Sequence, residues 1–134
     1  TFLPQYIALH QAINSELVAS CHAVARGGLV VHLALAAMGG ALGVTLRLPL
    51  IPALPDLSNT QKLYSESCGR FVITVAPEHK AAFEACFSGM KLAEVGMVTE
   101  SPDFMITGEN GDTIINENIH RLKDSWKKPF GDLI

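Results

Sequence analysis

Charged residues are scarce in this chain of 134 residues. Asp, Glu, Lys and Arg make up 17% of it, against about 25% in an average soluble domain. Ten basic and thirteen acidic residues give a net charge of −3. Because a protein that neutralises nucleic-acid phosphates needs clustered Lys and Arg, we expect no nucleic-acid partner. The low charge also predicts that another domain or subunit covers part of the surface.

Cysteine is rare as well, with Cys21, Cys68 and Cys86 and no CxxC pair. This odd, unpaired set argues against a disulfide framework and favours reduced thiols in the cytoplasm. Cys21-His22 suggests a nucleophile or a metal site, but no second Cys or His stands at ligand spacing and there is no HExxH motif. We therefore expect no metal site. The chain also has neither a Walker A loop nor a GxGxxG fingerprint.

Long uninterrupted hydrophobic runs are missing too. The most apolar stretch, 29–46, is about long enough for a membrane span to be considered. Three glycines interrupt it, His32 lies inside it and Arg47 follows it directly. We interpret the stretch as a buried helix, a turn and a strand, and expect neither a membrane segment nor a signal peptide.

Apolar residues, by contrast, make up 49% of the sequence, which is enough for one core in a single domain spanning 1–134. Hydrophobic spacing, glycines and prolines predict alternating helices and strands, and therefore a layered sheet with packed helices. The expected helices are 5–20, 29–38, 57–64, one that Pro77 opens, and one from Asn116 through Trp126. The expected strands are 21–25, 44–48, 70–75, 92–98 and 104–106.

Several polar or glycine-rich positions have more than one interpretation. Gly27-Gly28 precedes a helix, where free N–H groups bind phosphate, although such a pair is more often only a turn. His32 lies on an apolar helix and is expected to be a hydrogen-bonded core histidine. Arg70 follows Ser65-Glu66-Ser67 at a strand entrance, and its five donors predict a bond to Glu66 or to a nearby carbonyl that holds this loop.

Five short segments follow one another in an order that is typical of one family. They read Cys-His-Ala-Val-Ala-Arg-Gly-Gly-Leu at 21–29, Ala-Met-Gly-Gly-Ala-Leu-Gly at 37–43, Leu-Tyr-Ser-Glu-Ser-Cys-Gly-Arg-Phe-Val at 63–72, Val-Gly-Met-Val at 95–98, and a Trp-containing helix at 119–126. In this order they resemble the C-terminal domain shared by aminoimidazole ribonucleotide synthase and its relatives. The last helix favours the phosphoribosylformylglycinamidine synthases, the formylglycinamide ribonucleotide amidotransferases of purine synthesis.

This resemblance implies an α+β fold, a layered mixed β-sheet with packed helices. It implies that the chain is the C-terminal fragment of a longer enzyme that uses ATP and magnesium, with no cofactor expected in the fragment itself. The implied partners are N-terminal domains of the same chain, a glutaminase subunit or domain, and in many organisms a small bridging subunit. A homodimer of the fragment is a further expectation, as is an interaction surface at the proline-rich connection 49–55, where Leu50, Ile51 and Leu54 either form an apolar patch or fold back on the core.

The resemblance also assigns candidate site residues, none of them catalytic and none a metal ligand. The expected nucleotide- or phosphate-binding residues are His22, Arg26, Gly27 and Gly28, and the expected loop-structuring residues are Ser65, Glu66, Ser67 and Arg70.

The sequence departs from the family motif at three positions in the first segment. Ala23 and Ala25 stand where the family has Asp and Ser, and Arg26 stands where it has an acidic residue. Arg26 either pairs with a phosphate or carboxylate or is an exposed loop residue. Two other interpretations therefore stay open, namely another superfamily member (selenophosphate synthetase, thiamine-monophosphate kinase or hydrogenase maturation type) and a non-catalytic scaffold domain.

Overall fold

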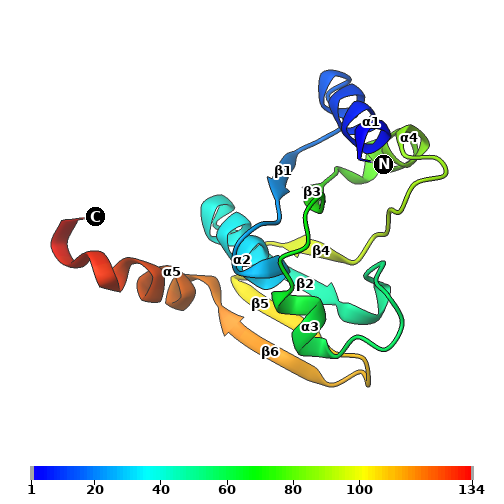
Figure 1. Ribbon diagram of the computed structural model, residues 1–134. Helices are drawn as coiled ribbons and strands as arrows, with labels where there is room; N and C mark the ends of the chain where they lie inside the picture. Colours follow the sequence, from blue (N-terminus) through cyan, green and yellow to red (C-terminus); the bar gives the residue numbers. More distant parts are fainter. Residues whose placement is uncertain (1, 134) are drawn as a thin grey trace.

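The computed structural model describes residues 2–133, which form two β-sheets with helices packed on them (Figure 1). The helices are α1 (Leu3–Asn14), α2 (Gly28–Gly40), α3 (Asn59–Tyr64), α4 (Lys80–Cys86) and α5 (Ile119–Lys127). The strands are β1 (Ser20–Ala23), β2 (Gly43–Arg47), β3 (Phe71–Thr74), β4 (Gly96–Thr99), β5 (Asp103–Thr107) and β6 (Thr113–Asn118). Short 3-10 turns lie at Leu48–Leu50, Pro77–His79 and Lys128–Leu133.

The larger sheet has the strand order β4-β2-β5-β6 and is mixed. Strands β2 and β5 are parallel, whereas β4 and β6 pair antiparallel to them at the two edges. The smaller sheet is the antiparallel pair of β1 and β3. The predicted α+β fold with a layered mixed sheet is therefore confirmed.

The main core lies between α2 and the larger sheet. Strands β2 and β5 alternate buried and more exposed residues, so one face of each strand points into this core. Phe104 and Ile106 of β5 are fully buried there, and Ile119 at the start of α5 closes one end. The opposite face of the sheet carries Met97 of β4, which is 62% exposed.

A second cluster joins α1 and α4 to the smaller sheet. Ala8, Leu9 and Ala12 of α1 pack with Phe83 and Phe87 at α4. Ile73 of β3 packs against this second cluster, whereas its neighbour Val72 packs against the main core. Because successive strand residues point to opposite faces, the two-stranded sheet separates the two clusters.

Three predicted helices differ from the structure. The first ends at Asn14 rather than residue 20, because Glu16 takes a left-handed backbone and turns the chain toward β1. The second, α2, is buried along one side only, since Val31 is exposed. The last does not begin at Asn116, because Asn118 caps α5 by accepting a hydrogen bond from the backbone N–H of His120 at 2.9 Å.

Two strand predictions differ as well. Residues 113–118 form β6, which the sequence pattern does not predict, and Asn116 lies within it opposite Met105. Residues 92–95 lack regular structure, and the strand predicted there is β4 at Gly96–Thr99. Among residues 2–133, no helix combines the length and the apolar character that a membrane crossing demands.

Ile106→Ala tests the main core. Removing this fully buried side chain should lower the free energy of unfolding by about 2–5 kcal/mol, because the surrounding residues relax only partly into the cavity. Ile114→Ala is the matched control, since Ile114 lies exposed at the irregular part of the β5–β6 pairing. Urea denaturation measures both. Equal losses of stability in the two variants would contradict this description of the core.

Candidate functional site

The Gly27–Gly28 turn connects β1 to α2 and lies directly against α3. Both glycines have positive φ, 91° and 73°. A Cβ on Gly28 would stand 2.6 Å from the Tyr64 backbone, which is closer than real Cβ atoms approach. Glycine is required here both for the left-handed conformation and for the close approach.

The loop after α3 binds this turn through a carboxylate. Glu66 Oε1 accepts the backbone N–H of Gly27 at 2.7 Å. Arg70 does not pair with Glu66 in this arrangement. Its guanidinium donates instead to the backbone carbonyls of Ser65 and, at 3.3 Å, Ser67. The expected bond from Arg70 to a nearby carbonyl is thus present, and partial burial lowers the pKa of Arg70 from its usual value.

His22 of β1 and His32 of α2 form a pair that no spacing in the sequence predicts. His22 Nε2 lies 2.8 Å from His32 Nδ1, and His32 Nε2 lies 3.1 Å from the carbonyl oxygen of Arg26. A carbonyl only accepts, so His32 Nε2 carries a hydrogen; in a neutral His32, Nδ1 accepts from His22. His32 is therefore hydrogen-bonded as expected, but it is only half-buried and lies outside the core.

Cys21 and His22 do not work as a pair. They are neighbours on β1 and point to opposite faces of the small sheet. Desolvation raises the pKa of the Cys21 thiol, which lowers the fraction of the reactive thiolate. Among residues 2–133, no three His, Cys, Asp or Glu side chains gather as metal ligands.

The donors around the turn do not fit a magnesium-bound phosphate in this arrangement. Ala23 and Ala25 have no side-chain oxygen, and the Gly27 N–H already donates to a carboxylate. The negative charge of Glu66 would also repel a phosphate at that amide. Phosphate binding by His22, Arg26, Gly27 and Gly28 stays a prediction. At Gly27 it requires the Glu66 carboxylate to release the backbone N–H that it accepts.

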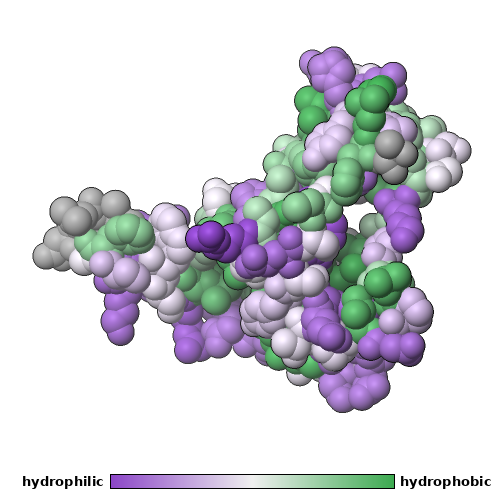
Figure 2. Space-filling view, viewed as in Figure 1, coloured by the Kyte–Doolittle hydropathy of each residue, from purple (hydrophilic) through white to green (hydrophobic). Residues whose placement is uncertain are grey.

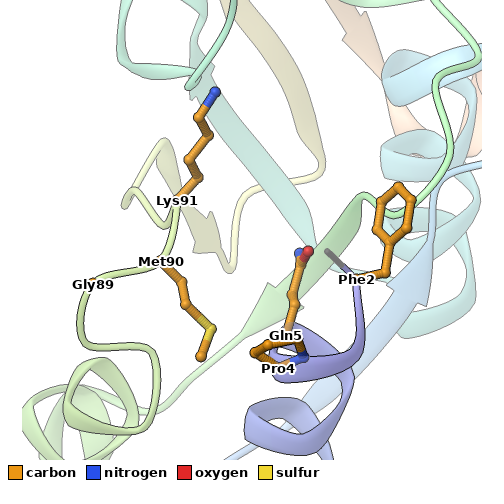
Figure 3. A pocket seen from close by; sticks show the side chains of 6 residues that line it. All are labelled: Phe2, Pro4, Gln5, Gly89, Met90 and Lys91. Carbon is orange, nitrogen blue, oxygen red and sulfur yellow. The ribbon is translucent and has the colours of Figure 1, made fainter.

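An open cleft of about 440 Å³ lies beside this region, between the start of α1 and the segment after α4. Figure 3 shows Phe2, Pro4 and Gln5 on one wall and Met90 and Lys91 on the other. Lys91 is the one ionisable side chain among the lining residues. The cleft contacts the loop that Arg70 holds, because Gln5 Nε2 donates to the Gly69 carbonyl at 3.1 Å.

The proline-rich connection divides its apolar residues between core and surface. Ile51 is half-buried and packs against the main core, as a segment folded back on the core would. Leu50 and Leu54 are exposed, Leu54 at 70% of its surface. The segment therefore folds back on the core at Ile51 and exposes apolar side chains at Leu50 and Leu54.

The sequence matches one protein family over most of its length. The profile described as "AIR synthase related protein, C-terminal domain" matches residues 3–109. The matched range contains β1 through β5 and both halves of the candidate site, and it stops before β6 and α5.

Solved structures from Thermotoga maritima have the same fold. One is PurL complexed with FGAR, with a TM-score of 0.76, and another is phosphoribosylformylglycinamidine synthase II, with a TM-score of 0.75. Each is 21% identical in sequence over 86% of this chain. PurL was also solved with ATP, again with a TM-score of 0.76. This chain spans about a fifth of the length of these relatives, 19% of the FGAR complex and 20% of the other two.

Gly28→Ala tests the close approach of the turn to α3. The left-handed backbone alone should cost about 1–2 kcal/mol of unfolding free energy, and the contact with the Tyr64 backbone adds to that loss. Gly39→Ala in α2 is the matched control. Nothing lies within 4 Å of its Cβ position, so it should stabilise the helix by about 0.5–1 kcal/mol. Thermal and urea denaturation measure both, and a neutral Gly28→Ala variant would contradict the described turn.

Proposed function

Since this chain belongs to the AIR synthase related protein, C-terminal domain family, we propose that it is the C-terminal domain of an ATP-dependent phosphoribosylformylglycinamidine synthase. The observation that carries the proposal is the fold shared with Thermotoga maritima PurL over 86% of the chain, at a TM-score of 0.76. The segments that resemble this branch of the superfamily, including the Trp-containing last helix, point in the same direction.

The proposed reaction belongs to the whole protein. ATP and ammonia from glutamine would convert the formamide of formylglycinamide ribonucleotide to an amidine in the cytoplasm. The rest of the longer chain, with its N-terminal domains, would supply ATP and magnesium binding, while a glutaminase subunit or domain and a small bridging subunit would deliver ammonia. In this domain the Gly27 amide already donates to Glu66, and Ala23 and Ala25 carry no side-chain oxygen. The turn therefore has no free group at these positions for binding ATP or magnesium.

The proposed role of this domain is to present a surface to the rest of the enzyme. Leu3, Tyr6 and Ile7 leave apolar area exposed on α1, and Leu54 does so on the proline-rich connection. Exposed apolar side chains that lie together, as Leu3, Tyr6 and Ile7 do on α1, are typical of interaction surfaces. We assign these residues to contacts with the N-terminal domains.

A scaffold without catalytic function is the second candidate, and one observation favours it. The family motif carries Asp, Ser and an acidic residue where this chain has Ala23, Ala25 and Arg26. Glu66 meanwhile binds the Gly27 amide from within the chain. A domain that had lost its ligand would keep such an internally satisfied turn.

The longer protein that contains this domain decides between the two candidates. Supplied with formylglycinamide ribonucleotide, ATP and either glutamine or ammonium, it should form the amidine and ADP, measured by mass spectrometry. Gly28→Ala should reduce this activity, because it displaces α2 from α3, whereas Gly39→Ala should leave it unchanged. Turnover of selenide or thiamine phosphate instead would assign another superfamily member, and the absence of any turnover would favour the scaffold.

The chain of 134 residues is expected not to hydrolyse ATP by itself. The reason is the mismatch between the donors at the turn and a magnesium-bound phosphate. A coupled assay for released phosphate measures this, with the longer protein as the positive control. ATP hydrolysis by the chain that a substitution within it abolishes would contradict this prediction.

Glu66→Gln removes the negative charge that repels phosphate and should raise phosphate binding at the Gly27 amide. The NMR signal of the Gly27 amide measures this binding.

A further inference from the structure

The last helix carries an apolar stripe that continues beyond the body of the protein. Ile119, Leu122 and Trp126 recur at spacings of three and four residues, which places them on one face of α5. Ile119 is 1% exposed, whereas Trp126 is 50% and Phe130 47% exposed. The two aromatic rings lie 5.8 Å apart. Residues 119–130, called the arm below, project away from both sheets in Figure 1, and the same part of the chain extends from the body of the molecule in Figure 2.

The arm lies outside residues 3–109, the range that the family profile matches. Only the base of the arm, Ile119 and Leu122, packs against the main core. Large aromatic side chains that stay half exposed are typical of binding anchors, and the planes of these two rings are tilted by 52° to each other. The inference drawn from them does not depend on the proposed enzymatic function.

An apolar groove of about 230 Å³ lies at the base of the arm. Val31 and Ala34 of α2 form one wall, Tyr64 of α3 another, and Ile115 of β6 and Leu122 of the arm complete it. Val31 and Tyr64 are themselves exposed. This groove therefore has the chemistry that would accept aromatic rings.

Charge is segregated along the same part of the chain. Residues 92–120 contain six acidic residues and no Lys or Arg, whereas residues 121–128 contain four of the ten basic residues and one acidic residue, Asp124. The acidic stretch includes β6, which contributes to the groove, and Arg121 already pairs with Glu117 of β6 at 3.3 Å. The basic arm thus complements the acidic side chains of the β5–β6 hairpin, Asp103, Glu109, Asp112 and Glu117, of which Glu109 already pairs with Lys62.

We propose that the arm of one copy of this chain seats Trp126 and Phe130 in the groove of a second copy, and that the contact is reciprocal. Leu122 of the arm lines the groove of its own copy, but Trp126 and Phe130 do not, because the helix runs away from the body (Figure 1). Lys127 and Lys128 then lie over the acidic β5–β6 hairpin of the other copy. A two-fold axis makes each contact twice, as in most symmetric dimers.

The single tryptophan of the chain makes the proposal directly measurable, because it is Trp126. The emission maximum of the unmodified chain should move to shorter wavelength as protein concentration rises. The mass from sedimentation equilibrium should double over the same concentration range. A chain that stays monomeric at all concentrations, or one that dimerises without a change in emission, overturns the proposal.

Variants assign the two halves of the contact. Phe130→Ala and the double change Lys127→Glu/Lys128→Glu should each raise the dimer dissociation constant at least tenfold. Val31→Glu should do the same from the groove side. Met97→Ala, which truncates an exposed apolar residue on the opposite face of the large sheet, is the matched control and should leave it unchanged. Circular dichroism and thermal melting verify that each variant is folded.

A mixing experiment separates arm exchange from any other dimer. Trp126→Ala/Phe130→Ala has a defective arm and an intact groove, whereas Val31→Glu has the reverse. Each variant alone should be monomeric at a concentration where the mixture still forms a heterodimer through one arm and one groove. In that mixture the tryptophan of the Val31→Glu variant should shift to shorter wavelength. A mixture that remains monomeric would refute the exchange, as would a dimer that survives in both variants alone.

Discussion

The close contact between the Gly27–Gly28 turn and α3 is the constraint on which the candidate site depends. The backbone of Tyr64 occupies the space where any side chain on Gly28 would stand. That contact lets Glu66 reach the Gly27 amide and places α2 next to the small sheet, where His32 meets His22. Gly27 and Glu66, which are 39 residues apart in the sequence, come within hydrogen-bond distance because Gly28 has no Cβ that would hold the turn away from α3.

The same contact changes the chemistry of the turn. A glycine pair before a helix offers backbone amides to an anion, and here the anion at Gly27 is a carboxylate of the chain itself. Arg70 adds to this arrangement by holding the carbonyls on both sides of Glu66. The Gly27 amide is therefore satisfied within the chain, and Ala23 and Ala25 beside it carry no side-chain oxygen.

The surface divides into regions of different character. The main core is closed by α2 and the larger sheet, yet α1, the proline-rich connection and the arm all expose apolar side chains. Exposed apolar side chains lower the solubility of a small domain unless another domain or subunit covers them. The low proportion of charged residues predicted this property from composition alone, whereas the place of each exposed residue depended on the packing.

Much of the fold follows from local patterns in the sequence. Glycine and proline positions, the buried strand residues and the family motifs determine the order of elements and the α+β class, because these signals act over a few neighbouring residues. Strand β6 was not predicted, since its polar sequence has no clear alternation, and Asn118 rather than Asn116 begins the last helix. The predicted and observed ends of elements also differ, most at the first helix, which ends at Asn14 instead of residue 20, because local patterns do not fix where an element ends.

At the candidate site the sequence indicates the residue types but not which residues bind one another. The residue types at His22, Gly27, Glu66 and Arg70 were all recognisable, and the bond from Arg70 to a carbonyl followed from its five donors. That Glu66 binds Gly27 and that His22 binds His32 was decided only by the tertiary structure. Both contacts join segments that the chain brings together by packing α2 against α3 and β1, and hydrogen-bond partners across such distances are chosen by three-dimensional proximity rather than by spacing along the sequence.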